Sequence, residues 1–130
     1  MTEKRAQKIG FILVDGFSLM SLASATEPLR AANQLSGETL YDINFISAAG
    51  NHSESSIGIF SEGKSIAEND YDYDLVFSAA AGNPATYDNP DLLKYIEMLA
   101  AKRVNLGGRS GGPVVLASAG SQVKRRSTGQ

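Results

Sequence analysis

Short apolar runs alternate with longer helical patterns along most of this chain. Residues 8–14 are almost continuously apolar and end at Asp15-Gly16, and residues 41–47 alternate before Ala-Ala-Gly. Two further apolar runs cover residues 74–78 and 104–107. Runs of this length and character are typical of strands, and continuous ones are typical of strands covered on both faces. We therefore predict four strands at these positions.

The stretch after the first run has helical spacing. Its apolar and small residues recur at helical intervals within residues 19–34, at Leu22, Ala25, Leu29 and Ala32. Gly37 lies just past this pattern and predicts the end of the helix. Pro28 lacks a backbone N–H and predicts a kink or a second helix start, with Thr26 as its N-cap.

A second helix is predicted to begin at Asn89-Pro90, with Asn89 as the N-cap and Pro90 in the first helical position. Its buried stripe is expected to consist of Leu92, Leu93, Ile96, Leu99 and Ala100. Residues 50–73 are rich in Ser, Gly and Glu, and the short apolar pieces at 57–60 and 65–67 predict brief strands or a hairpin. A small apolar helix is predicted at 113–119.

Strands that alternate with helices predict right-handed crossovers and a mostly parallel sheet with helices on both faces, which makes an α/β three-layer sandwich. Residues 1–8 are expected to form a flexible arm, and residues 9–130 a single domain. After the helix at 113–119, a parallel sheet would require another strand. We therefore expect the domain to be truncated at its C-terminus.

Composition excludes several classes of function. The chain has 130 residues, no cysteine and a formal net charge of -2. Thiolate metal sites and a cysteine nucleophile are thus excluded, and no strong attraction to nucleic acid follows. No apolar run approaches the ~20 residues that span a bilayer, so the expected location is the cytoplasm. The acidic residues Asp70, Asp72 and Asp74 lack the glycine and glutamate of a calcium loop, so we expect an acidic turn, no metal and no cofactor.

The segment most suggestive of chemistry is Gly108-Arg109-Ser110-Gly111-Gly112, which fits the pattern G-x-S-x-G. A serine between a strand and a helix is the setting of the nucleophile elbow. The helix N-terminus behind such a turn offers N–H groups to an anion. Carboxyl ends of parallel strands are also where open α/β sheets bind ligands. Ser110 is therefore either a nucleophile or a residue that shapes a ligand site.

A nucleophilic serine requires a general base. The single histidine, His52, precedes Ser110, whereas the histidine of α/β-hydrolases follows the serine. This order favours a binding site over catalysis. Arg109 has a planar guanidinium that suits a carboxylate ligand. Glu27 is expected either to face the cleft or to be a solvated acid, and Gly82 could offer backbone N–H groups to the same cleft.

Three segments together resemble a known family. IGFILVDGFSLMSLASATEPLRAAN, YDLVFSAAAG and NLGGRSGGPVVLASAG followed by KRRST look like the PfpI-like, glutamine-amidotransferase-like domain of GlxA-type regulators. In that family this domain precedes an AraC-type pair of helix-turn-helix motifs. The resemblance implies a flavodoxin-like fold, a homodimer and a small-molecule effector, since the relatives sense nitrogen-rich compounds such as betaine, carnitine or arginine. It also implies that DNA is bound only through a domain absent from this chain.

The chain departs from the enzymes of that family at their reactive positions. Cysteine at the elbow is replaced by Ser110, the glutamate after the first strand by Ser21, and the nearest match to the histidine after the elbow helix is Gln130. The resemblance therefore implies a sensor domain that is not an enzyme. Its ligand-binding residues are expected to be Ser110, Arg109, Gly111, Gly82, Glu27 and Ser21. The alternative is a PfpI-like hydrolase that uses Ser110 as its nucleophile.

Overall fold

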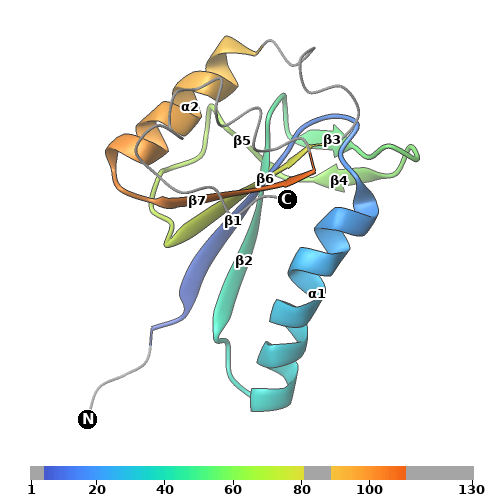
Figure 1. Ribbon diagram of the computed structural model, residues 1–130, viewed down its shortest axis with the longest axis vertical. Coiled ribbons are helices and arrows are strands. Elements are labelled where there is room, and N and C mark those ends of the chain that lie inside the picture. The colour runs from blue at the N-terminus through green and yellow to red at the C-terminus, as the bar shows by residue number, and fades with distance from the viewer. Residues whose placement is uncertain (1–4, 81–88, 111–130) are drawn as a thin grey trace.

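The computed structural model describes residues 5–80 and 89–110 (Figure 1). Its elements are, in chain order, β1 (Gln7–Leu13), α1 (Leu19–Ser36), β2 (Tyr41–Ser47), β3 (His52–Glu54), β4 (Phe60–Glu62), β5 (Lys64–Ser65), β6 (Leu75–Ala80), α2 (Pro90–Ala101) and β7 (Asn105–Ser110).

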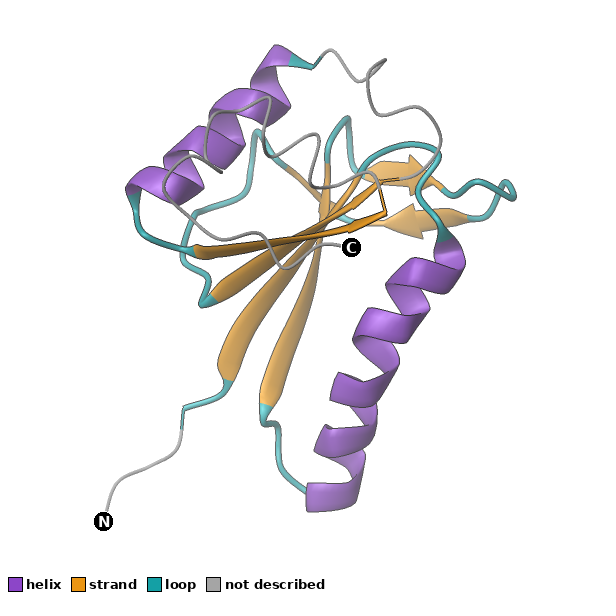
Figure 2. Cartoon of the chain, viewed as in Figure 1, coloured by secondary structure: helices purple, strands orange, loops and turns teal. Residues whose placement is uncertain are grey.

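Five of these strands form one sheet in the order β5-β2-β1-β6-β7, and each neighbouring pair in it is parallel (Figure 2). The predicted parallel sheet is therefore confirmed. Its register is regular, with Phe11 of β1 opposite Phe45 of β2 on one side and Phe77 of β6 on the other. The rings of Phe11 and Phe77 stack with their centroids 5.5 Å apart.

The two helices cover opposite faces of this sheet, which explains the almost continuous apolar run in β1. Phe11 and Leu13 point to the face covered by α1, where Leu22 is buried. Ile12 points to the other face, where it joins the α2 side chains that include Ile96. Because successive strand residues alternate between faces, a strand between two helices must be apolar at nearly every position.

Gly10 is needed where β1 faces the α2 side. A Cβ built on Gly10 would lie 2.8 Å from Ile46 Cδ1 and 3.1 Å from Tyr73 Cε1. Both neighbours are buried side chains of the same core. A side chain at position 10 would therefore force this core to move.

Helix α1 is one continuous helix, so the predicted second start is wrong. It begins after Ser18, whose Oγ accepts the N–H of Ser21, and it ends at Gly37 with a φ of 75°. Pro28 lies inside it, and Thr26 is not an N-cap. The Thr26 hydroxyl donates instead to the Leu22 carbonyl one turn earlier, at 2.9 Å, as threonine does within a helix.

The other predicted boundaries are close to those observed. Asn89 caps α2 as expected, with its Oδ1 accepting the N–H of Leu92 at 3.2 Å. Strand β7 runs on to Ser110, further than the predicted end at 107. Residues 50–73, predicted to hold brief strands or a hairpin, form the antiparallel pair β3–β4 and then β5. Ile57 and Ile59 lie in the turn between β3 and β4. The helix predicted at 113–119 lies outside the described residues.

Candidate functional site

Strand order places the candidate site at the carboxyl edge of the sheet. The chain passes from β1 to β2 on one side and later returns to β6 on the other side of β1. Such a reversal opens a crevice at the carboxyl ends of the strands, which is where open α/β folds bind ligands. Leu13 ends β1 there, and Ser47 and Ser110 end β2 and β7.

Ser110 is the last residue of β7 and pairs in register with Ala80, while Arg109 pairs with Ala79. The serine therefore belongs to the end of a strand at the carboxyl edge. The turn predicted to follow it lies outside the described residues, as do Gly111 and Gly82. Their contribution to a ligand site stays a prediction.

Ser21 and Glu27 occupy different parts of α1. Ser21 lies in the first turn, where its N–H donates to Ser18 Oγ at 3.1 Å, so it is held at the end of the helix nearest the carboxyl edge. Glu27 lies roughly 9 Å further along the axis. Its carboxylate accepts a hydrogen bond from Arg30 Nε at 2.7 Å, and its side chain is 59% exposed. The described contacts of Glu27 are therefore those of a surface acid.

Buried hydroxyl groups lie at the same edge, and the sequence analysis did not single them out. The hydroxyls of Ser47 and Ser53 are 2.9 Å apart, and Ser53 also donates to the Leu13 carbonyl at 3.1 Å. These bonds join the loop and hairpin after β2 to the end of β1. Ser78 of β6 is also buried, and its hydroxyl has no hydrogen-bond partner in the described part of the chain. Single serines in apolar strands give no sequence signal for such positions.

A cavity of about 750 Å³ opens between α2 and the loops that follow β2 and β5. It is lined by Ala48, Ala49, Gly50, Ser65, Ile66, Ala67, Tyr71, Asn89, Asp91, Lys94, Tyr95 and Met98. Its volume falls within the range of small-molecule sites. Of the ligand-binding residues predicted from the sequence, Ser21 and Glu27 have described side chains, and neither of them lines the cavity.

Two tyrosines of the core on the α2 side, Tyr95 at the cavity and Tyr73, have raised pKa values. Burial, together with the nearby Asp70 carboxylate, raises the pKa of Tyr73 to about 12. Burial also raises the pKa of Tyr95, whose hydroxyl donates to the Asp70 carbonyl at 2.7 Å. Both hydroxyls are therefore hydrogen-bond donors at neutral pH.

His52 lies apart from Ser110 in the chain's topology. It is exposed at the start of β3, where it pairs with Glu62 of β4. The hairpin that carries it follows β2, and β2 lies three strand spacings, roughly 14 Å, from β7. The described structure thus shows no contact between His52 and the strand that ends in Ser110.

The described residues show no cluster of three or more His, Cys, Asp or Glu side chains that could hold a metal ion. Among the same residues, neither helix combines the length and the apolar character required to cross a membrane.

The chain is similar to curated transcriptional regulators over nearly its whole length. It is 39% identical to the HTH-type transcriptional regulator GlxA of Rhizobium meliloti over 118 residues. This match covers 90% of this chain and 36% of that protein. It is 37% identical over 123 residues to the HTH-type transcriptional regulator CdhR of Pseudomonas aeruginosa, covering 95% and 36%. The chain therefore spans about a third of the length of these relatives. No protein-family model matches it.

Solved structures agree with this resemblance. The structure of an AraC family transcriptional regulator from Pseudomonas putida matches with a TM-score of 0.79 and 25% identity, over 92% of this chain and 64% of that one. A ThiJ/PfpI family protein from Pseudomonas syringae matches with a TM-score of 0.72 and 14% identity, over 90% and 47%. The flavodoxin-like fold and the resemblance to GlxA-type regulators are thus confirmed.

Proposed function

We propose, on the premise that this chain is a homologue of the regulators GlxA and CdhR with the fold of ThiJ/PfpI domains, that it senses a small molecule for an AraC-family transcriptional regulator. The observation that carries this proposal is the match to GlxA, which extends over 90% of the chain. The effector is a small nitrogen-containing metabolite. DNA is bound through a separate helix-turn-helix domain, and the protein acts in the cytoplasm.

The position of the chain's single histidine supports a sensor that is not an enzyme. Removing the histidine of a serine triad costs several orders of magnitude in rate. The only histidine of this chain is exposed in β3. Ser110 therefore shapes a ligand site without reacting.

Ser110→Ala tests this reading against the PfpI-like hydrolase. We expect no esterase, amidase or glyoxalase turnover from either form, because the chain's single histidine precedes Ser110 and lies in β3. Binding to a panel of betaine-like and amino-acid ligands is expected to weaken by about 0.5–1.5 kcal/mol in the variant, which corresponds to one hydrogen bond. Ser36→Ala, at the far end of α1, is the control variant. Turnover by the wild type that disappears in Ser110→Ala would overturn the sensor proposal in favour of the hydrolase.

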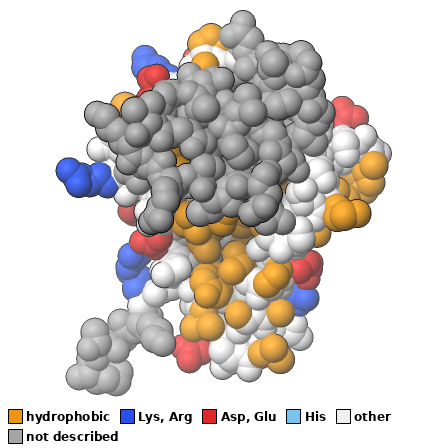
Figure 3. Space-filling model, in the orientation of Figure 1, with side chains coloured by type: hydrophobic (Ala, Val, Ile, Leu, Met, Phe, Trp, Pro, Cys, Tyr) orange, Lys and Arg blue, Asp and Glu red, His pale blue; other side chains and the backbone are white. Residues whose placement is uncertain are grey.

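The same proposal includes a homodimer. Three large apolar side chains of the β3–β4 hairpin are exposed to solvent, Ile57 by 69%, Ile59 by 50% and Phe60 by 64%, and hydrophobic side chains gather at the right of Figure 3. Exposed apolar patches of this kind mark association surfaces, and we propose that a second copy of the chain covers this one.

Sedimentation at micromolar concentration tests the dimer. We expect a dimer for the wild type and a shift toward monomer for Phe60→Ser. Leu35→Ser is the control. Leu35 is 87% exposed, but it lies in the last turn of α1 and not on the β3–β4 hairpin. A wild type that sediments strictly as a monomer would contradict the proposal, as would equal weakening by both substitutions.

A further inference from the structure

The walls of the 750 Å³ cavity are fixed by hydrogen bonds from three segments of the chain. Asn89 Nδ2, at the start of α2, donates to the Ala48 carbonyl at 3.1 Å. The Ile66 N–H donates to the Ser47 carbonyl at 3.1 Å, and the Tyr95 hydroxyl donates to the Asp70 carbonyl at 2.7 Å. A pocket whose walls are tied together in this way is largely formed before a ligand arrives, which lowers the entropic cost of binding.

One part of the cavity is apolar. Ile66 and Met98 contribute hydrophobic side chains, and Tyr71 presents a ring that packs against Tyr95 with centroids 5.1 Å apart. Small residues line the side formed by the loop after β2, at 48–50. Short side chains there leave room for the body of a ligand rather than filling the space themselves.

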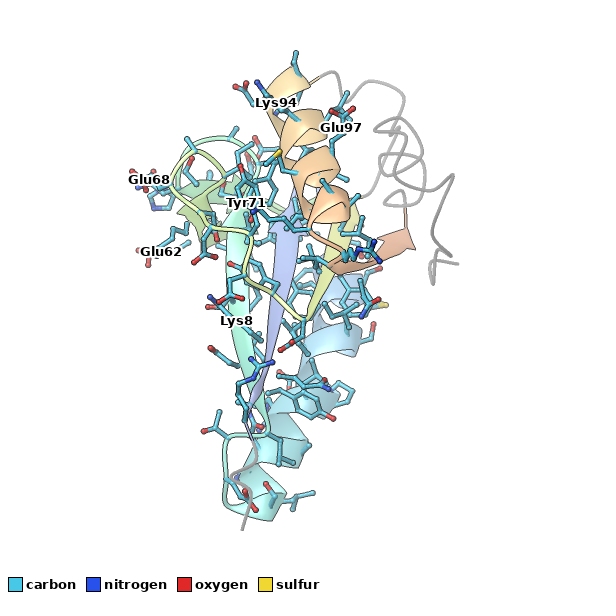
Figure 4. All side chains as sticks on the ribbon, turned by 90° about the vertical axis from the view of Figure 1, so that its left-hand side faces the viewer. Lys8, Glu62, Glu68, Tyr71, Lys94 and Glu97 are labelled. Atoms are coloured by element: carbon cyan, nitrogen blue, oxygen red, sulfur yellow. The ribbon has the colours of Figure 1, made fainter. Side chains whose placement is uncertain are left out.

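The Lys94 ammonium and the Tyr71 hydroxyl are polar groups of this cavity. Neither the Lys94 ammonium nor the Tyr71 hydroxyl forms a hydrogen bond or an ion pair with a described residue. Figure 4 shows Lys94 on α2 and Tyr71 on the loop between β5 and β6, both on the side of the molecule that faces the viewer. Both groups are donors, and one of them carries a positive charge.

Asp91 also lines the cavity, but its charge has a local explanation. It lies in the first turn of α2, where the helix dipole stabilises a carboxylate. The helix dipole does not favour a cation at Lys94, and no ion pair joins Lys94 to a described carboxylate. The polar chemistry still free in this cavity is therefore that of a site for one anionic oxygen group.

We propose that the cavity between α2 and the loops after β2 and β5 binds a small organic carboxylate with an apolar body, and that Lys94 pairs with its carboxylate while the Tyr71 hydroxyl hydrogen-bonds to the ligand. This site rests on the proposed sensing function and is distinct from the end of β7 at Ser110. Asp91, three residues before Lys94 on the same helix, selects against a second carboxylate in the ligand.

A set of four-carbon probes tests the site on the 130-residue chain. Butyrate supplies the carboxylate and the apolar body, butyramide replaces the charge with a neutral group of similar shape, and succinate adds a second carboxylate. 4-Aminobutyrate tests whether an ammonium group, placed toward Asp91, improves binding. Chemical-shift titration by NMR follows the backbone amides of α2 and of the loops at 48–50 and 65–71, and it detects the weak binding expected of such small probes.

We expect butyrate to shift these amides in the wild type, and butyramide and succinate to bind more weakly. Lys94→Met keeps the length of the side chain and removes the charge, so butyrate affinity should fall about tenfold or more, as expected for loss of a charge-assisted hydrogen bond. Tyr71→Phe should weaken butyrate severalfold. Lys64→Met, which removes a charge from exposed Lys64 in β5, is the matched control and should leave the affinity unchanged.

The outcomes separate this inference from the proposed function. If butyrate shifts residues at the end of β7 instead, and Lys94→Met leaves its affinity unchanged, the site beside α2 is wrong while a sensing role stands. If no carboxylate probe shifts any amide of the cavity, the site is likewise overturned. The sensing role itself falls only with the turnover experiment on Ser110→Ala.

Discussion

Asn89 joins the start of α2 to the end of β2. Its Oδ1 accepts the N–H of Leu92 at 3.2 Å as an N-cap, and its Nδ2 donates to the Ala48 carbonyl at 3.1 Å. One side chain thus satisfies a free donor of the helix and a carbonyl of the neighbouring loop. The N-cap role was predictable from Asn-Pro, whereas the second bond depends on the packing of α2 against the sheet.

We predict that Asn89→Ala lowers the free energy of unfolding by about 1–2 kcal/mol, because both bonds are lost. Asn89→Asp keeps the cap acceptor and loses only the donor to Ala48, so it should cost less. Urea unfolding of the three proteins measures both differences. Equal stability of Asn89→Ala and the wild type would contradict the double role.

Gly10→Ala is expected to destabilise the fold by about 1–3 kcal/mol, as overpacking does. The new Cβ would meet Ile46 Cδ1 at 2.8 Å. Ile46→Val removes that methyl group and should cost about 0.5–1.5 kcal/mol by itself. The double variant should lose less stability than the sum of the two single losses, because Ile46→Val removes the methyl group that clashes with the new Cβ. Simple additivity in thermal or urea unfolding would show that this contact does not decide the need for glycine.

The raised pKa of Tyr73 predicts that the free energy of unfolding falls at alkaline pH. Its pKa is about 12 in the folded chain against an ordinary value of 10.0, so the unfolded chain releases its proton first. The contribution is fully present below pH 10 and is lost as the pH rises toward 12. Tyr73→Phe should flatten this part of the stability profile. An unchanged decline between these pH values would assign it to other groups.

Tyr95→Phe isolates the hydroxyl that donates to the Asp70 carbonyl. We expect it to lower the free energy of unfolding by about 0.5–1.5 kcal/mol at neutral pH, the usual contribution of one hydrogen bond. Tyr41→Phe is the control, because the Tyr41 hydroxyl forms no hydrogen bond with another described residue. Equal effects of the two substitutions in urea unfolding would count against the bond to Asp70.

The lowered pKa of Asp74 predicts that the free energy of unfolding falls at acidic pH. Its Oδ2 accepts the N–H of Lys8 at 2.7 Å and its Oδ1 pairs with Arg5 at 3.0 Å, and these bonds lower the pKa of the carboxyl below its ordinary 3.8. The stability it contributes is present above pH 3.8 and is lost as the pH falls below that value. Asp74→Asn should reduce the acid dependence of unfolding. Asp72→Asn, on the same acidic turn, should leave it unchanged.

The pattern of apolar residues predicted most of this fold. Both observed helices and all four predicted strands are present, because strand alternation, helical spacing and the Asn-Pro and Gly signals are local properties of the chain. The interpretation of Pro28 failed for a physical reason. An isolated proline favours a helix boundary. Leu22 before it is buried against the sheet and Leu29 after it is partly buried there, and this packing favours one continuous helix.

For the candidate sites too, part of the information is local to the sequence and part depends on the tertiary structure. The sequence by itself determined that Ser110 lies just after an apolar strand and that no histidine follows it in the position of a general base. The structure extends that strand to Ser110 itself. Only the tertiary structure decided that Tyr71 from one loop and Lys94 from α2 line the same cavity. They are more than twenty residues apart, and β6 lies between them in the chain, so no local pattern connects them. The loop from β5 to β6 and the helix of the β6–β7 crossover come together only once the parallel sheet has formed.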